Sequence, residues 1–270
     1  MRVFVLVMLC SLLLAFHEFQ RMPDGRLHVH ILDVGQGDSL LLISPSGKHI
    51  VIDGGPDMSL LEHLGEFMPF FDRHIELLIL THPDADHITA LPEVLQRYTV
   101  GSVLLSGALQ HNGSYDAFLH HIAAQGIPVL LPDATMDIAM GDGLTLDILW
   151  PSPDVFGVLP DDPNALSVVV RALYGPYAIL LTGDIDEASE ATILAAGHDV
   201  QSDIIKIAHH GSRTSSSTGF IAAVHPLSAL ISSGSGNTFG HPHIDVLTRL
   251  EALGITIRRT DTESTVSLAF

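Results

Sequence analysis

The stretch IELLILTHPDADH, residues 75–87, carries most of the information in this chain. Its apolar run from Leu77 to Leu80 predicts a buried strand, and the ITALPEVLQRY that follows the stretch, residues 88–98, predicts a helix. The turn after the strand carries four side chains that can ligate a metal ion: His82, Asp84, Asp86 and His87. A solvated acidic turn explains any one of them. The four together favour a metal site, because burying them without a compensating cation is costly.

The mixture of ligand types narrows the choice of ion. Two imidazoles and two carboxylates suit Zn²⁺, Mn²⁺ or iron better than Ca²⁺, which prefers oxygen alone. Other histidines of the chain also occur in close pairs, at His209 and His210 and at His241 and His243. This clustering favours ligand roles over chance.

Size and charge restrict the class of protein. The chain has 270 residues, and 47% of them are hydrophobic, so a substantial core is available and global disorder is excluded. The formal net charge of −19 argues against a protein that coats nucleic acid through a basic face. It does not exclude a nucleic-acid substrate, because bound divalent cations offset local carboxylate charge.

Residues 1–22 differ from the rest of the chain. The fourteen residues 3–16 are almost wholly apolar, with Arg2 before them and His17, Glu18 and Arg21 after them. This is short for a membrane span and predicts a signal peptide or a marginal membrane anchor; a buried N-terminal strand is the alternative. The charge bias places the folded domain outside the cytoplasm, exported or membrane-anchored. Cys10 is the only cysteine, which excludes an intrachain disulfide and a cysteine zinc site.

Residues 23–270 alternate strand-like and helix-like stretches without a fixed-period repeat. Strands are predicted over 27–34, 39–45, 49–55, 77–80, 101–107, 127–132, 203–212 and 229–237, and strand pairs over 136–152, 167–184 and, as a final hairpin, 256–270. Helices are predicted over 60–71, 88–98, 115–126, 187–197 and 244–254. The pattern indicates one α/β domain of two halves that pack sheet to sheet, with helices outside.

Candidate ligands follow three widely separated strands. They lie in the turn 82–87, in Thr182-Gly183-Asp184 and in His209-His210-Gly211-Ser212. Strand ends at one edge of a sandwich can converge on a single cleft. A carboxylate such as Asp184 could there bridge two cations about 3.5–4 Å apart, and the pair would generate hydroxide near neutral pH.

The order DVGQGDS (33–39), IDGG (52–55), HPDADH (82–87), LLTGD (180–184), HHGS (209–212) and GHP (240–242) resembles the metallo-β-lactamase fold. More narrowly, it resembles the hydrolase domain of the ComEC competence proteins and its stand-alone relatives. The resemblance runs from about residue 27 to the C-terminus. It implies a four-layer αββα sandwich over residues 23–270, with a dinuclear site at one sheet edge.

The resemblance also implies ligand roles. One ion would be held by His82 and Asp84 and the second by Asp86 and His87, with Asp184 bridging and His209 completing the site. Asp84 stands where the broader superfamily has a second histidine, and Asn164 lies near the position of a further missing histidine. Because an amide oxygen is a weaker ligand than imidazole, three alternatives are open for the first site: it binds its ion loosely, it prefers a harder ion such as Mn²⁺, or it fills only when substrate is present.

Other polar residues have two interpretations each. Asp53 is either the acceptor that orients a ligand histidine or an Asx-turn residue. His210 either donates a proton to a substrate oxygen or is a hydrogen-bonded structural histidine. Ser212 and His241 are candidates for phosphate contact. Lys206 lies in a predicted strand and would need a partner if buried.

These features predict a hydrolase that uses two divalent metal ions, zinc or manganese. The expected activity is that of a phosphodiesterase or nuclease. The resemblance to the ComEC domain implies DNA or another nucleotide-containing substrate, with single-stranded DNA as the expected one, and a link to DNA uptake. Asp86 and His210 are the expected catalytic residues: a metal-bound hydroxide would attack phosphorus, and His210 or a water would protonate the leaving group. One alternative is hydrolysis of a lactone, thioester or other carbonyl ester. Another is a non-catalytic metal-binding module attached to a membrane DNA channel.

Overall fold

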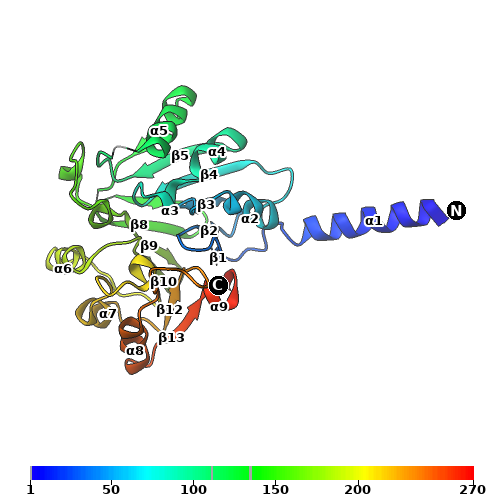
Figure 1. The fold of residues 1–270 in the computed structure, drawn as a ribbon. Helices are drawn as coiled ribbons and strands as arrows, with labels where there is room; N and C mark the ends of the chain where they lie inside the picture. Colours follow the sequence, from blue (N-terminus) through cyan, green and yellow to red (C-terminus); the bar gives the residue numbers. More distant parts are fainter. Residues whose placement is uncertain (1, 111, 134–135) are drawn as a thin grey trace.

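Two seven-stranded sheets form the centre of the computed structural model, which describes residues 2–110, 112–133 and 136–270 (Figure 1). The first sheet contains, in spatial order, β14 (Val266–Ala269), β1 (His28–Ile31), β2 (Leu40–Ile43), β3 (His49–Ile52), β4 (His74–Leu80), β5 (Thr99–Leu105) and β6 (Val129–Leu130). The second contains β13 (Thr256–Arg259), β12 (Ser228–Ile231), β11 (Ile204–Lys206), β10 (Tyr177–Leu181), β9 (Val169–Tyr174), β8 (Leu144–Trp150) and β7 (Asp137–Ala139).

Helices cover the outer face of each sheet. The first sheet packs against α2 (Ser59–Phe67), α4 (Leu91–Arg97) and α5 (Gly113–Gln125). The second packs against α6 (Glu187–Ala195), α7 (Thr218–Val224) and α8 (Ile244–Ala252). Short elements complete the described fold: α3 (Ala85–Ile88), α9 (Thr260–Glu263) and the 3-10 turns η1 (Pro153–Val155), η2 (Pro163–Leu166) and η3 (Ala208–Gly211).

The strand β4 shows why the layers form. Successive side chains of a strand point to opposite faces, so an uninterrupted apolar run must be covered on both sides. Leu77 and Ile79 enter the core between the two sheets, whereas Leu78 and Leu80 enter the core beneath α2, α4 and α5. The same alternation in the other central strands yields three cores between four layers. The predicted αββα sandwich of the metallo-β-lactamase type is therefore confirmed.

The predicted hairpin at the C-terminus is wrong. β13 pairs with β12 in the second sheet, in parallel, whereas β14 crosses over and pairs antiparallel with β1 in the first sheet. The intervening α9 redirects the chain, and the buried hydroxyl of Thr260 anchors it by donating to the carbonyl of Ser233. β14 in this way covers an edge of β1 that would otherwise be exposed.

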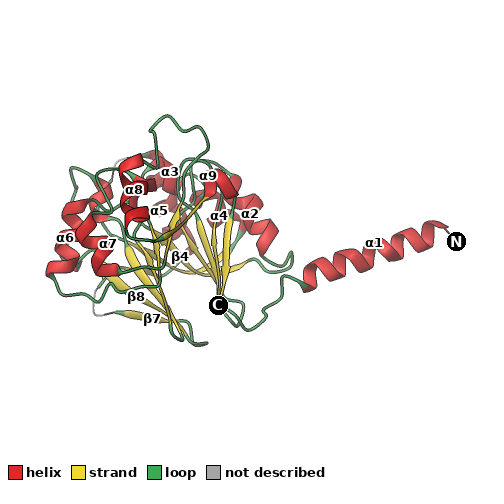
Figure 2. Ribbon diagram, turned by 90° about the horizontal axis from the view of Figure 1, so that it is seen from below, coloured by secondary structure: helices red, strands yellow, loops and turns green. Residues whose placement is uncertain are grey.

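The N-terminal helix α1 (Arg2–Phe19) extends away from both sheets, as Figure 1 and Figure 2 show from two directions. Its described side chains are exposed almost throughout, including Phe4, Leu13 and Phe16. The alternative of a buried N-terminal strand is therefore wrong. None of the helices in the described part of the chain is both long enough and apolar enough to cross a membrane.

Candidate metal centre

Loops that follow strands of both sheets meet at one edge of the sandwich. Asp53 follows β3, and His82 and His87 follow β4, in the first sheet. Asp184 and His210 follow β10 and β11 in the second. The turn Gly35-Gln36-Gly37 packs closely against these loops. A Cβ at Gly37 would lie 2.3 Å from the carbonyl oxygen of Asp86, so only glycine lets the two segments approach this closely.

The carboxylate of Asp184 lies at the centre of the cluster. Its Oδ2 is 3.3 Å from Nε2 of His87 and 3.2 Å from Nε2 of His210. Nε2 of His210 is also 3.3 Å from Oδ2 of Asp86. His82, His87 and Asp184 bring their ligand atoms within 4.8 Å of one another, as do Asp86, His87 and His210. These two groups share His87 and lie side by side.

Several buried polar atoms in the described part of the chain have no hydrogen-bond partner. They include Nε2 of His87, Nε2 of His210 and Oδ1 of Asn164. Buried polar atoms are almost always paired, so orphans that share one site need an explanation. Imidazole nitrogen, carboxylate oxygen and amide oxygen are together a donor set that suits Zn²⁺ or Mn²⁺. The residues present therefore fit a metal centre.

The opposite ring nitrogens of these histidines are held by the surrounding structure. Nδ1 of His87 lies 2.8 Å from Oδ2 of Asp53, whose carboxylate also accepts hydrogen bonds from the backbone and hydroxyl of Thr81. Nδ1 of His210 lies 3.1 Å from the carbonyl oxygen of Ser232. Nδ1 of His82 lies 3.2 Å from the hydroxyl of Ser167. The acceptors beside His87 and His210 keep the proton on Nδ1, which leaves Nε2 of each ring free to ligate.

The charges of the centre depend on one another. Burial alone would lower the pKa of His87, but the carboxylates of Asp184 and Asp53 outweigh it and raise that pKa well above its usual value. The same opposition, with Asp184 and Asp38 as the acids, raises the pKa of His210. Burial would raise the pKa of Asp184, but His210 and His87 hold it well below its usual range. A bound cation would take the place of the histidine protons between these acids.

A pocket opens above the cluster. It is lined by Gln36, Pro56, Asp84, Ala85, Asp86, Asn164, Asp184, His209 and Phe239. His241 lies beside it, with its ring 5.7 Å from that of His209. Burial lowers the pKa of His209, and burial with the neighbouring His210 lowers the pKa of His241 to about 4. Neutral imidazoles, which can donate or accept a hydrogen bond, therefore surround the mouth.

The two adjacent histidines of η3 take different places from those expected. His209 was expected to complete the ligand set, but the groups of converging ligands contain His210 and not His209. Both residues have left-handed backbone, with φ of 52° and 53°, which turns their rings 78° apart. As a result, the imidazole of His210 points inward to Asp184, whereas His209 lines the mouth of the pocket.

Of the remaining candidate residues, some contact the metal centre or its pocket and others do not. Asp53 contacts His87 as an orienting acceptor and also has the left-handed φ of a turn, 61°. Asn164 reaches the pocket with its unpartnered oxygen. Ser212, in contrast, is buried with its hydroxyl 3.0 Å from that of Thr214, away from the residues that line the pocket. Asn237 brackets His241 with hydrogen bonds to its backbone N–H and carbonyl.

Sequence reasoning missed the role of Asp38 as an ion-pair partner, because its place beside the Gly35-Gln36-Gly37 turn favours a role in capping the turn or in holding a loop near the metals. Its carboxylate is buried, contacts the ammonium of Lys206 and lies 3.3 Å from Nδ1 of His210. A signal was available, because Lys206 was expected to need a partner if buried. Nothing in the local pattern indicates that the partner lies in the distant Gly-Gln-Gly-Asp turn.

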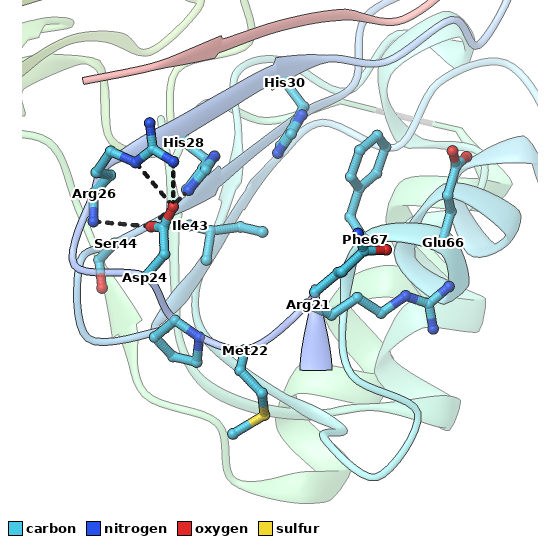
Figure 3. A pocket seen from close by; sticks show the side chains of 12 residues that line it. Arg21, Met22, Asp24, Arg26, His28, His30, Ile43, Ser44, Glu66 and Phe67 are labelled. Carbon is cyan, nitrogen blue, oxygen red and sulfur yellow. Dashed lines mark hydrogen bonds and ion pairs between the residues drawn. The ribbon is translucent and has the colours of Figure 1, made fainter. Parts of the chain in front are cut away.

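A second hollow lies where α1 joins the domain (Figure 3). Arg26 and His28 line it, but both contact the carboxylate of Asp24. His30 stacks against Phe67 at the other side, with ring centroids 4.1 Å apart. The charged groups of this hollow thus have partners of their own, which distinguishes it from the metal centre.

Residues 32–221 match the family described as the metallo-beta-lactamase superfamily. The chain belongs to this superfamily. It therefore has the metal-dependent hydrolase fold of that superfamily, and the converging histidines and aspartates lie within or next to the matched residues.

Curated relatives include ComE operon protein 3 and competence protein ComA. The chain is 28% identical over 265 residues to ComE operon protein 3 of Bacillus subtilis, covering 90% of this chain and 33% of that protein. It is 29% identical over 247 residues to competence protein ComA of Neisseria gonorrhoeae, covering 90% of this chain and 32% of that protein. The chain thus spans about a third of the length of these relatives.

A solved structure shows the same superfamily fold. Igni18, a metallo hydrolase from Ignicoccus hospitalis, superposes with a TM-score of 0.59 at 14% identity, over 90% of this chain and 99% of that one. At this level of identity the likeness concerns the fold alone.

Proposed function

We propose that this protein is a metal-dependent phosphodiesterase that holds two divalent cations, Zn²⁺ or Mn²⁺, between the ends of its sheets. The observation that carries the proposal is the convergence of buried, unpartnered imidazole nitrogens of His87 and His210 on Asp184. One ion would be held by His82, Asp84 and Asn164, the other by Asp86, His87 and His210, with Asp184 between them. When bound, such ions polarise a phosphoryl oxygen and lower the pKa of a coordinated water.

The residues of the chain prepare this centre. Asp53 holds the proton of His87 on Nδ1, and the carbonyl of Ser232 does the same for His210, so that each Nε2 faces inward. In this assignment His210 is a ligand rather than the proton donor expected from the sequence. His209, at the mouth, is then in a better position to donate a proton or hydrogen bond to a substrate oxygen.

Single-stranded DNA is the substrate we propose. The name of one relative, competence protein ComA, connects it with competence. At the mouth of the pocket, the exposed ring of Phe239 lies nearly parallel to that of His241, with centroids 5.9 Å apart, and offers a surface for stacking a base. The net charge of −19 disfavours extensive backbone contacts, so we propose recognition of a short segment near the scissile bond.

We also propose that the protein is exported or membrane-anchored through residues 1–22, with the hydrolase domain outside the cytoplasm. The support is the row of exposed apolar side chains on α1, which water solvates poorly. The two relatives are about three times as long as this chain, so about two thirds of each lies outside the match. We propose that a membrane channel is the partner of the hydrolase domain.

Metal analysis followed by assays on three substrates tests the function. Protein loaded with Mn²⁺ or Zn²⁺ should hydrolyse bis-p-nitrophenyl phosphate and single-stranded DNA. Asp86→Ala and Asp184→Ala should abolish this activity, and Asp199→Ala, an exposed carboxylate paired with Arg171, should retain it. Hydrolysis of a lactone alone would indicate a carbonyl esterase. Bound metal without turnover would indicate an accessory module, and either result would reject the phosphodiesterase.

A further inference from the structure

Lys206 is a buried cation next to the proposed metal centre. It ends β11 and is only 1% exposed. Its ammonium contacts Oδ2 of Asp38, lies 3.5 Å from Oδ1 of Asp184 and donates a hydrogen bond to the carbonyl of Gly183 at 3.2 Å. A buried ammonium is unfavourable unless it is paired, and here two carboxylates from different sheets pair with it.

These contacts close into a ring of four side chains. Lys206 contacts Asp38, Asp38 contacts Nδ1 of His210, and Nε2 of His210 contacts Oδ2 of Asp184. Oδ1 of Asp184 then returns to Lys206. The two oxygens of Asp184 are therefore divided: Oδ1 faces the ammonium, and Oδ2 faces the histidines of the centre.

The ring also contains a further group of potential ligands, in which Asp38 is the residue that the proposed function does not use. Asp38, Asp184 and His210 bring ligand atoms within 4.8 Å of one another, and all three are buried. The two acids of this group are those that contact the ammonium of Lys206. The ammonium of Lys206 therefore lies where a third cation would otherwise find ligands.

We propose that Lys206 is a positioning residue that substitutes for a cation: it occupies the seat formed by Asp38, Oδ1 of Asp184 and the carbonyl of Gly183, and it leaves Oδ2 of Asp184 for the catalytic ions. This inference rests on the proposed metal-dependent function. It explains why the acids stay together in metal-free protein, because the ammonium compensates their charge before any ion arrives. The ammonium also prevents a further ion from binding at Oδ1 of Asp184, so ions bind only on the Oδ2 side.

Three variants test the seat, with Mn²⁺ as the probe. Lys206→Ala removes the charge and leaves room, so it should bind about one Mn²⁺ per chain more than wild type after dialysis. Lys206→Met removes the charge but fills the room, so it should bind no additional ion and should melt at a lower temperature than wild type in chelator. Lys206→Arg restores the charge and should match wild type in Mn²⁺ content. The measurements are elemental analysis and thermal unfolding.

The outcomes separate this inference from the proposed function. Wild type that binds neither Mn²⁺ nor Zn²⁺ would reject the proposed function. Wild type that binds metal, with an unchanged Mn²⁺ content in Lys206→Ala, would reject the role of Lys206 alone. If Lys206→Ala is unfolded in chelator, recovery of the fold in Mn²⁺ but not in Na⁺ would support the seat. Failure to fold in both would overturn it.

Discussion

Nδ1 of His87 lies 2.8 Å from the carboxylate of Asp53, and both side chains are completely buried. The acid comes from the end of β3 and the imidazole from the helix after β4, so two neighbouring parallel strands bring them together. Thr81 donates two further hydrogen bonds to the same carboxylate. The ring is thereby prevented from turning, and its Nε2 remains directed at Asp184.

Loss of the Asp53 carboxylate should weaken metal binding without removing a ligand. We expect Asp53→Asn to reduce affinity for Mn²⁺ or Zn²⁺ by about 10- to 100-fold, the usual effect of losing such an orienting partner. Asp24→Asn is the matched control, because Asp24 contacts His28 at 2.9 Å far from the centre. Titration calorimetry measures both. Equal affinities for the two variants would contradict this role of Asp53.

The neighbouring histidines of η3 should differ sharply on substitution. His210→Ala removes a proposed ligand and should lower both the metal content and kcat to background. His209→Ala should keep the metal content of wild type and mainly raise KM for DNA, because the lost contact would be with substrate. Elemental analysis and steady-state kinetics distinguish the two. The reverse result would restore His209 as the ligand.

The unpartnered oxygen of Asn164 should influence which ion is preferred. Asn164→His supplies an imidazole, which suits zinc, and should tighten Zn²⁺ binding by about tenfold, or ~1.4 kcal/mol. Asn164→Ala should weaken binding instead. Competition between Zn²⁺ and Mn²⁺ measures the preference. An unchanged preference in Asn164→His would place this side chain outside the ligand set.

Removal of metal should destabilise the protein. An ion present at 100 times its dissociation constant stabilises the folded state by about 2.7 kcal/mol, so chelation should lower the Tm by about 5 °C or more. Asp184→Ala should melt at the same temperature with and without chelator. Scanning calorimetry before and after chelation checks both statements. If the Tm of wild type is the same with and without chelator, tightly bound ions are excluded.

His30 should make stability depend on pH independently of the metal centre. Burial, together with the nearby His28, lowers its pKa from 6.5 to about 4. Because the folded state disfavours the protonated ring, its contribution is present above pH 6.5 and is lost as the pH falls toward 4, by at most about 3 kcal/mol.

A non-titrating replacement tests this contribution. His30→Asn should show a smaller loss of unfolding free energy between pH 7 and 4.5 than wild type, both in chelator. Urea unfolding at the two pH values provides the comparison. An identical loss in the two proteins would show that the protonation of His30 has no effect on stability.

Much of the fold follows from local pattern. Apolar runs such as Leu77 to Leu80, separated by helix-like stretches, predict buried parallel strands with helices outside, because both strand faces must be covered. The terminal strands show the limit. Both are predicted as strands, but β13 and β14 join different sheets. β13 pairs with the nearby β12, whereas β14 pairs with β1, whose residues lie more than 200 positions away, and no local pattern predicts that partner.

The sequence by itself determined which loops carry the ligands, because the residue types after β4, β10 and β11 are visible as motifs. Only the tertiary structure decided that His210 rather than His209 faces Asp184, since two successive left-handed residues direct their side chains differently. It also decided that Asp38 neutralises Lys206. Charges from opposite sheets become partners only when the sheets pack and exclude the water that would otherwise solvate them.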